Sequence, residues 1–106
     1  MVRVEWTDIA IEDMNSIGEY IGKDSLKYAK IVVKNLFAST NILKQHPRIG
    51  RIVPEFNTPI IRELIRGNYR IIYRIVDEKH IDILTVRHSA RLLFNLPYVD
   101  FQNKEN

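Results

Sequence analysis

The sequence predicts an α+β fold in which an antiparallel sheet carries a hairpin of two helices on one of its faces. Three observations support this prediction. The first residues alternate between apolar and charged side chains, as a half-buried strand does. Apolar side chains then recur at helical spacing over two consecutive stretches, and three further strand-like segments follow. The predicted order of elements is therefore β-α-α-β-β-β.

The first half of the chain contains one predicted strand and both predicted helices. Residues 2–6 alternate Val and Trp with Arg and Glu, and Thr7 is expected to cap the first helix. This helix is expected to end near Gly22, and the second to end at His46-Pro47, because the residue before proline disfavours helical backbone. The apolar stripes are Ala10, Met14, Ile17 and Ile21 in the first helix and Ala29, Val32, Val33, Leu36, Thr40 and Leu43 in the second.

The second half contains the predicted sheet. Residues 47–59 are expected to be irregular, since they include Gly50, Pro54 and Asn57. The strand segments that follow are Ile60–Arg66, Tyr69–Val76 and Ile81–Arg87, joined by turns at 67–68 and 77–80. The middle segment places Tyr69, Ile71, Tyr73 and Ile75 on one face and Arg70, Ile72, Arg74 and Val76 on the other. If the tyrosine face packs on the helices, the arginine face is left partly open; a register shifted by one residue would exchange the two sets. The first strand must pair with these three to satisfy its backbone.

Size and composition limit the class of protein. With 106 residues the chain is expected to form one domain over residues 1–101, followed by a polar tail over 102–106. It has no cysteine, which excludes disulfides, thiolate catalysis and cysteine-ligated zinc. We see no signal-peptide pattern, no apolar run near the roughly 20 residues of a membrane span, and no phosphate-loop or metal-ligand spacing. A cytoplasmic protein without cofactor, metal or membrane association is therefore expected.

The positive charges are divided between the two halves of the chain. The net charge is only +3, but eight of the nine arginines lie between Arg48 and Arg91, whereas five of the seven lysines lie between Lys23 and Lys44. Arginine offers a planar fork of donors that suits phosphates and carboxylates. The alternative is that these arginines merely coat the surface.

Clustered guanidinium groups on an open sheet face suit a polyanion, such as an RNA backbone or an acidic peptide. Tyr69 and Tyr73 could stack on bases, but packing in the core is their favoured role. The candidate residues for binding a partner or a nucleic acid are Arg62, Arg70, Arg74, Arg87, Arg91 and Tyr98.

The same face could also supply the groups of a metal-independent ribonuclease. That reaction needs a base for the 2′-hydroxyl, an acid for the leaving oxygen and positive charge for the phosphate. His88 could act as acid or base and Glu63 as base, while Arg70 and Arg74 would stabilise the transition state. The alternative is structural, with His88 ending a strand and Glu63 pairing with a neighbouring arginine.

Four segments form an ordered set of motifs. The first two are Trp6-Thr7…Ala10…Glu12-Asp13-Met14…Ile17…Tyr20-Ile21 and His46-Pro47-Arg48-Ile49-Gly50-Arg51. The third is Ile61-Arg62-Glu63-Leu64…Gly67-Asn68-Tyr69-Arg70-Ile71-Ile72-Tyr73-Arg74, and the fourth is Ile83-Leu84-Thr85-Val86-Arg87-His88-Ser89-Ala90-Arg91. Together, over residues 2 to 91, they resemble the RelE/ParE superfamily of toxins from bacterial and archaeal type II toxin–antitoxin systems. The resemblance implies the same β-α-α-β-β-β order.

Two activities are known within that superfamily. RelE-like members cleave mRNA on the ribosome, whereas ParE-like members poison DNA gyrase. The helix hairpin, the Pro-Arg-Ile-Gly-Arg link and the Val-Arg-His-Ser-Ala-Arg ending look more ParE-like, so a ParE-like gyrase inhibitor is the leading expectation. Arg70 matches the arginine that RelE-like ribonucleases use on the scissile phosphate, and His88 and Arg91 lie near their other active groups. The lysine pair of the RelE pattern has no counterpart here.

Two alternatives therefore accompany gyrase inhibition. One is a ribosome-dependent endoribonuclease that uses Arg70, Arg74 and His88, assisted by Glu63 or Tyr98. The other is a module without toxicity that only binds an antitoxin. Every version implies an antitoxin partner, which is expected to place acidic and apolar residues on the arginine face and in grooves beside the helix hairpin. DNA gyrase, or the ribosome and mRNA in the alternative, is the expected target.

Overall fold

In a computed structural model, the protein is described from residue 1 to residue 89. The elements in chain order are β1 (Arg3–Trp6), α1 (Asp8–Gly22), α2 (Leu26–Ser39), the 3-10 helix η1 (Thr40–Lys44), β2 (Arg51–Ile52), β3 (Ile61–Arg66), β4 (Tyr69–Asp77) and β5 (His80–His88). This order confirms the predicted α+β class. The predicted second helix is divided into α2 and η1, and a short strand, β2, lies in the link that was expected to be irregular.

The five strands form one sheet in the order β1-β5-β4-β3-β2. The pairs β3–β4 and β4–β5 are antiparallel, as predicted. The unpredicted β2 also pairs antiparallel with β3, whereas β1 runs parallel to β5. The sheet is therefore mixed: the three later strands are antiparallel, and the first strand, whose direction was not predicted, is parallel to its neighbour. The physical reason is the connection: strands joined by a tight turn must be antiparallel, but β1 is joined to the sheet through two helices and is free to run either way.

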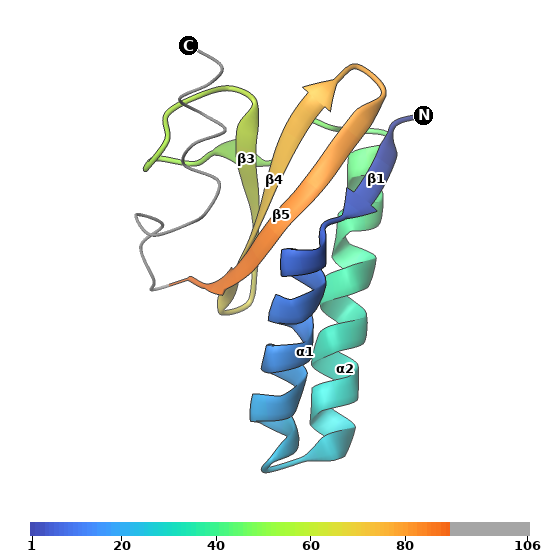
Figure 1. Cartoon of the computed structure of the whole chain (residues 1–106), viewed down its shortest axis with the longest axis vertical. Helices are drawn as coiled ribbons and strands as arrows, with labels where there is room; N and C mark the ends of the chain where they lie inside the picture. The colour runs from blue at the N-terminus through green and yellow to red at the C-terminus, as the bar shows by residue number, and fades with distance from the viewer. Residues whose placement is uncertain (90–106) are drawn as a thin grey trace.

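Helices α1 and α2 lie side by side, and α1 runs along β5 (Figure 1). Thr7 connects β1 to α1. Its side chain accepts a hydrogen bond from the N–H of Ala10 at 3.2 Å, which confirms the predicted N-cap. Its hydroxyl also donates to the carbonyl of Ile83 at 2.8 Å. Thr7 thereby fixes both the first residue of α1 and the position of β1 along β5.

The sheet has apolar residues on both faces. The helix-side core confirms the predicted face of β4, since Ile71 and Tyr73 are completely buried and Tyr69 packs against the same cluster. A second, smaller cluster lies on the other face, where Val53 and Phe56 of the link cover Ile61 and Ile72. The arginine face is therefore not open along β3 and β4 as expected, because the 53–60 segment folds over it.

Among residues 1–89, no helix is long and apolar enough to span a membrane.

Candidate functional site

Arg70 is at the centre of a chain of ion pairs on the face of the sheet away from the helices. Its Nε donates to Oε1 of Glu63 at 2.6 Å, and its two terminal nitrogens donate to the Glu55 carboxylate at 2.8 and 2.9 Å. Arg51 donates to the second oxygen of Glu63. The side chain of Glu63 is fully buried and that of Arg70 is 6% exposed. Two cations and two anions thus neutralise one another; the side chains of Arg70 and Glu63 are buried, that of Glu55 is mostly buried, and that of Arg51 is exposed.

The strand register explains this arrangement. Glu63 stands opposite Arg51 on β2 and opposite Ile72 on β4, two positions from Arg70. A diagonal neighbour at this distance is within reach of a long side chain. Glu55 comes from the 53–60 segment, which turns back on itself at Asn57, a residue with positive φ whose N–H donates to the carbonyl of Val53. The fold of this segment therefore delivers Glu55 to Arg70.

These contacts determine what Arg70 can do chemically. The hydrogen bonds that Arg70 donates to Glu55 and Glu63 raise the pKa of its guanidinium above its ordinary value, although desolvation opposes them. Arg70 is therefore a permanent cation with carboxylates already in the positions that a phosphate would take. A phosphate could reach it only if Glu55 moved away.

Two further predicted residues hold the link between η1 and β2 in place. Arg62 donates to the backbone carbonyls of Pro59 and Gly50 at 2.8 and 2.9 Å. The hydroxyl of Tyr73 accepts from the N–H of Gly50 at 3.0 Å and donates to the carbonyl of Pro47 at 2.8 Å. Burial raises the pKa of the Tyr73 phenol, while the Gly50 N–H and nearby arginines lower it to a smaller extent. Tyr73 is a core residue, as favoured from the sequence.

The other predicted residues lie apart from the Arg70 cluster. Arg74 stands opposite Asp82 of β5. The ring of His88 meets Tyr69 edge-on, with centroids 6.0 Å apart, at the far end of the sheet. Arg91 and Tyr98 lie outside the described residues. Of the four residues proposed for catalysis, the structure thus brings Glu63 and Arg70 into contact, and Arg74 and His88 occupy separate positions. The contact confirms the structural pairing that was one reading of Glu63.

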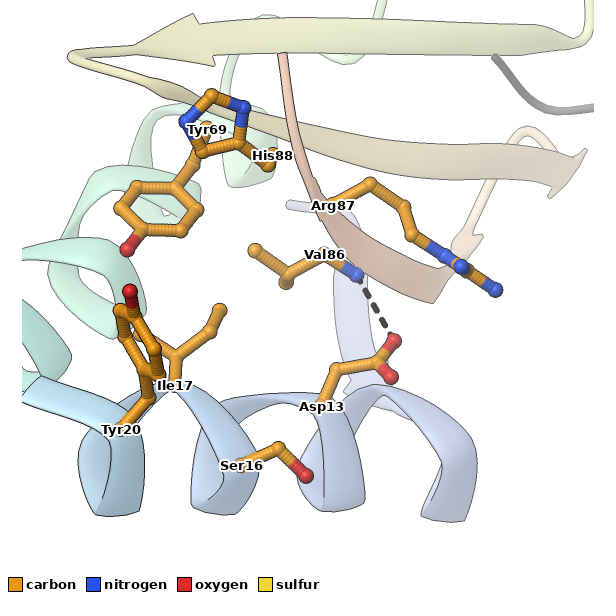
Figure 2. Close-up of a pocket in the computed structure, with 8 residues that line it drawn as sticks. All are labelled: Asp13, Ser16, Ile17, Tyr20, Tyr69, Val86, Arg87 and His88. Atoms are coloured by element: carbon orange, nitrogen blue, oxygen red, sulfur yellow. Dashed lines mark hydrogen bonds between the residues drawn. The ribbon is translucent and has the colours of Figure 1, made fainter. Parts of the chain in front are cut away.

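A groove of about 680 Å³ opens between α1 and the ends of β4 and β5 (Figure 2). Tyr20 of α1 and Tyr69 of β4 point toward each other across it. Arg87 and His88 lie along its strand side, and its floor is apolar, from Ile17 and Val86. The groove thus combines aromatic and apolar surface with a cation, a composition that suits a peptide segment.

Asp13 closes one end of this groove. β1 pairs with β5 only as far as Ile83, so the edge of β5 continues past the end of β1. There the Asp13 carboxylate accepts a hydrogen bond from the N–H of Val86 at 3.1 Å and another from the hydroxyl of Thr85. The carboxylate takes the place of a neighbouring strand at this position.

Asp13 was not among the residues predicted to form a site. One signal was present: Asp13 directly precedes Met14 and follows Ala10 by three positions, so it borders the apolar stripe of α1. A carboxylate at that border must either reach solvent or find a donor in the sheet. Tyr20 borders the same stripe, and its position beside Tyr69 depends on how the helix packs.

The chain is similar to known toxin proteins. The family model described as the ParE toxin of type II toxin–antitoxin systems, parDE, matches residues 4–93. Toxin RelE2 of Caulobacter vibrioides is 32% identical over 92 residues, which cover 87% of this chain and 100% of that protein. Putative toxin Y4kP of Sinorhizobium fredii is 35% identical over 89 residues, which cover 82% of this chain and 88% of that protein.

Two solved structures extend the comparison. A chain of the chromosomal ParDE toxin–antitoxin system from P. aeruginosa superposes with a TM-score of 0.67 at 25% identity, covering 83% of this chain and 96% of that one. A chain of the RelBE2 toxin–antitoxin complex from Mycobacterium tuberculosis gives a TM-score of 0.52 at 26% identity, with 82% and 96% covered.

Proposed function

The chain belongs to the ParE toxin family of type II toxin–antitoxin systems, and on this premise we propose that it inhibits DNA gyrase and is neutralised by a cognate antitoxin. It is a toxin of the RelE/ParE superfamily, in agreement with the motifs in its sequence. Gyrase is the proposed target. Because gyrase acts on DNA in the cytoplasm, the cytoplasm is the proposed site of action.

The state of Arg70 is the observation that carries the choice of gyrase over mRNA. Arg70 is the residue that matches the phosphate-binding arginine of RelE-like ribonucleases. Here its side chain is 6% exposed and forms ion pairs with Glu55 and Glu63. Catalysis by charge stabilisation requires donors that are aimed at the reacting phosphate and available to it. A neutralised and buried arginine supports a role in holding the fold, which leaves inhibition through protein contacts as the favoured activity.

A supercoiling assay tests the proposal directly. Purified toxin, added over a wide range of doses to gyrase, relaxed plasmid and ATP, is expected to reduce supercoiling and to leave cleaved DNA when the complex is denatured. Heat-unfolded toxin at the same concentrations is the control. Unchanged supercoiling at all doses would contradict gyrase as the target.

A ribosome-dependent endoribonuclease is the second candidate, because a toxin named RelE2 is 32% identical over 92 residues of this chain. In this case Glu55 must release Arg70 before the phosphate binds. The variant Glu55→Gln weakens that pair, so it is expected to cleave mRNA faster than the wild-type toxin. Primer extension on mRNA after induction measures both; if neither protein creates new ends, this candidate is excluded.

The antitoxin is proposed to occupy the groove between α1 and β5. Its apolar floor and Arg87 suit a segment rich in apolar and acidic residues, as expected from the sequence. We therefore expect an acidic reading frame of roughly 50–100 residues beside this gene, a length that rests on the family resemblance and on binding through a short segment. Arg87→Glu is expected to weaken antitoxin binding at least tenfold, whereas Lys79→Glu, in the turn at the other end of β5, is the matched control. Equal antitoxin binding by Arg87→Glu and Lys79→Glu would exclude the groove as the binding site.

Induced expression of the wild-type protein tests toxicity itself. If expression does not slow growth, the protein is better explained as a module that only binds an antitoxin.

A further inference from the structure

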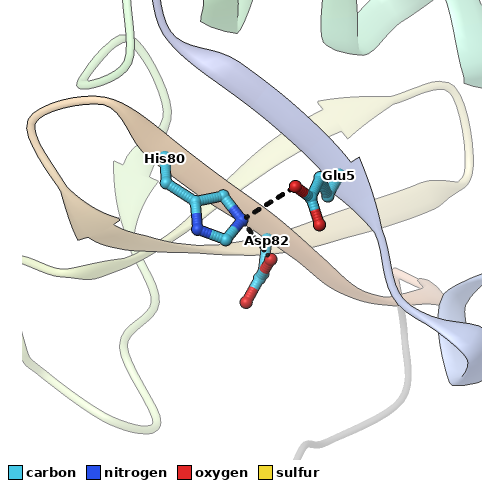
Figure 3. Close-up of side chains that lie close together, drawn as sticks. All are labelled: Glu5, His80 and Asp82. Carbon is cyan, nitrogen blue, oxygen red and sulfur yellow. Dashed lines mark ion pairs between the residues drawn. The ribbon is translucent and has the colours of Figure 1, made fainter.

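Three potential metal ligands gather where β1 pairs with β5, away from the groove and from Arg70. The parallel register places Glu5 beside Asp82, and His80 lies two positions before Asp82. Val4 and Trp6 pack in the helix-side core, so the intervening Glu5 faces the other side of the sheet. The ligand atoms of the three side chains all lie within 4.8 Å of one another, grouped around Nε2 of His80 (Figure 3).

The contact of His80 with its neighbours is close but is not a hydrogen bond. Its Nε2 lies 2.8 Å from Oδ1 of Asp82 and 3.8 Å from Oε1 of Glu5. Within residues 1–89 this buried nitrogen nevertheless has no hydrogen-bond partner, because neither oxygen lies along the N–H direction of the ring. Two ligands held at about 2.1 Å from one ion stand about 3.0–3.4 Å apart without pointing at each other. The observed separations of 2.8 and 3.8 Å lie on either side of this range, so small side-chain movements would bring the three groups around one ion.

The two carboxylates of this cluster lie close to each other, and Arg74 of β4 stands opposite Asp82. Glu5 and Asp82 are directly opposed on neighbouring strands, and like charges in that position destabilise a sheet. Arg3 approaches Glu5 at 2.5 Å, but both side chains are more than half exposed, and an exposed pair of this kind contributes little. A divalent ion would neutralise both carboxylates at once.

We propose that Glu5, His80 and Asp82 bind a divalent transition-metal ion, and that Zn²⁺ is the best-suited ion. Imidazole nitrogen and carboxylate oxygen are its usual ligands where cysteine is absent, and water fills the fourth position. The ion would join the first strand to β5. It therefore stabilises the folded toxin in proportion to the metal concentration, independently of the target of the toxin.

Calorimetric titration of Zn²⁺ into the chain tests the site. The protein is prepared without a polyhistidine tag and stripped of metal with a chelator. The wild type is expected to bind one ion. His80→Gln and Asp82→Asn are each expected to weaken binding at least tenfold, whereas His46→Gln, which alters an exposed histidine outside the cluster, is the control and keeps the wild-type affinity. Arg3→Gln is expected to bind several-fold more tightly, since Arg3 competes for Glu5.

Thermal melting with and without Zn²⁺ separates loss of the site from loss of the fold. All variants are first compared in chelator, where their melting temperatures should be similar. Added Zn²⁺ is then expected to raise the melting temperature of the wild type and of His46→Gln, and to leave that of His80→Gln unchanged. The proposal is overturned if His80→Gln binds Zn²⁺ as the wild type does, or if the wild type binds none at millimolar concentration.

Discussion

The Asp13 carboxylate accepts a hydrogen bond from the backbone N–H of Val86 at 3.1 Å, which joins the middle of α1 to β5 beyond the end of β1. The same carboxylate accepts the hydroxyl proton of Thr85. One side chain therefore satisfies two donors of the sheet, fixes the distance of the helix from β5 and closes one end of the groove.

Asp13→Ala is expected to lower the free energy of unfolding by about 1–3 kcal/mol, the usual contribution of hydrogen bonds to a charged group. Asp13→Asn keeps an acceptor and should recover part of the loss. Glu12→Ala, at the neighbouring exposed position, is the control and should change stability by less than about 0.5 kcal/mol. Urea unfolding measures all three. Amide hydrogen exchange at Val86 should accelerate in Asp13→Ala; an unchanged rate would contradict the role of this bond.

Gly50→Ala is expected to destabilise the fold by about 2–3 kcal/mol. A Cβ at Gly50 would lie 2.6 Å from both the backbone oxygen of Glu63 and the hydroxyl of Tyr73, so the link would have to move away from the sheet. Gly67→Ala is the comparison. A Cβ there meets nothing within 4 Å, and only the positive φ opposes it, at about 1–2 kcal/mol. A larger loss in Gly67→Ala than in Gly50→Ala, measured by thermal unfolding, would be inconsistent with this packing.

Arg70→Met is expected to cost about 3–5 kcal/mol, because it leaves the fully buried Glu63 with one of its two partners removed. The double variant Glu63→Gln with Arg70→Met removes the buried charge as well. It should therefore lose less stability than Arg70→Met alone, although it carries one more substitution. Denaturant unfolding of the four proteins of this cycle gives the coupling. Strictly additive losses would show that the pair is not coupled.

The raised pKa of Tyr73 predicts a loss of stability at alkaline pH. In the unfolded chain a tyrosine releases its proton near pH 10, whereas the buried Tyr73 keeps its proton to higher pH. Above that pH the unfolded state binds fewer protons than the folded state, so the free energy of unfolding falls as the pH rises.

The variant Tyr73→Phe isolates this contribution. It should be less stable at neutral pH, since it loses the bonds to Gly50 and Pro47, but its stability should fall less steeply between pH 10 and 11. Urea unfolding at a series of pH values compares the two slopes. Identical slopes would assign the alkaline loss to other groups.

The sequence predicted those parts of the fold that depend on local periodicity. Alternation along residues 69–76 placed Ile71 and Tyr73 on the helix side, and the Thr7 cap was identified from its residue type. The parallel direction of β1 was not predictable in this way, because it depends on how two helices return the chain. β2 is only two residues long, which is too short for any period to be visible.

Two residues of the Arg70 cluster were identified from the sequence, but their burial was not predicted. Arg70 and Glu63 were singled out, but their burial depends on Glu55, which belongs to a segment without periodicity. The proximity of Glu5, His80 and Asp82 was not predicted for a related reason. Glu5 and His80 are far apart in the sequence, and only the pairing of β1 with β5 brings them together.

That pairing also determines the order in which the molecule can be completed during synthesis. The hydrogen bond from Thr7 to Ile83 spans 76 residues, so a chain that emerges from its N-terminus carries its first strand without a neighbour until β5 has been made. The two helices contact each other over a short separation in the sequence, so the hairpin can form much earlier, before its contacts with β5 are possible. Its apolar stripes then remain uncovered while translation continues. The nascent protein is therefore most prone to aggregation before its sheet exists, and a chaperone that shields the hairpin would act in that interval.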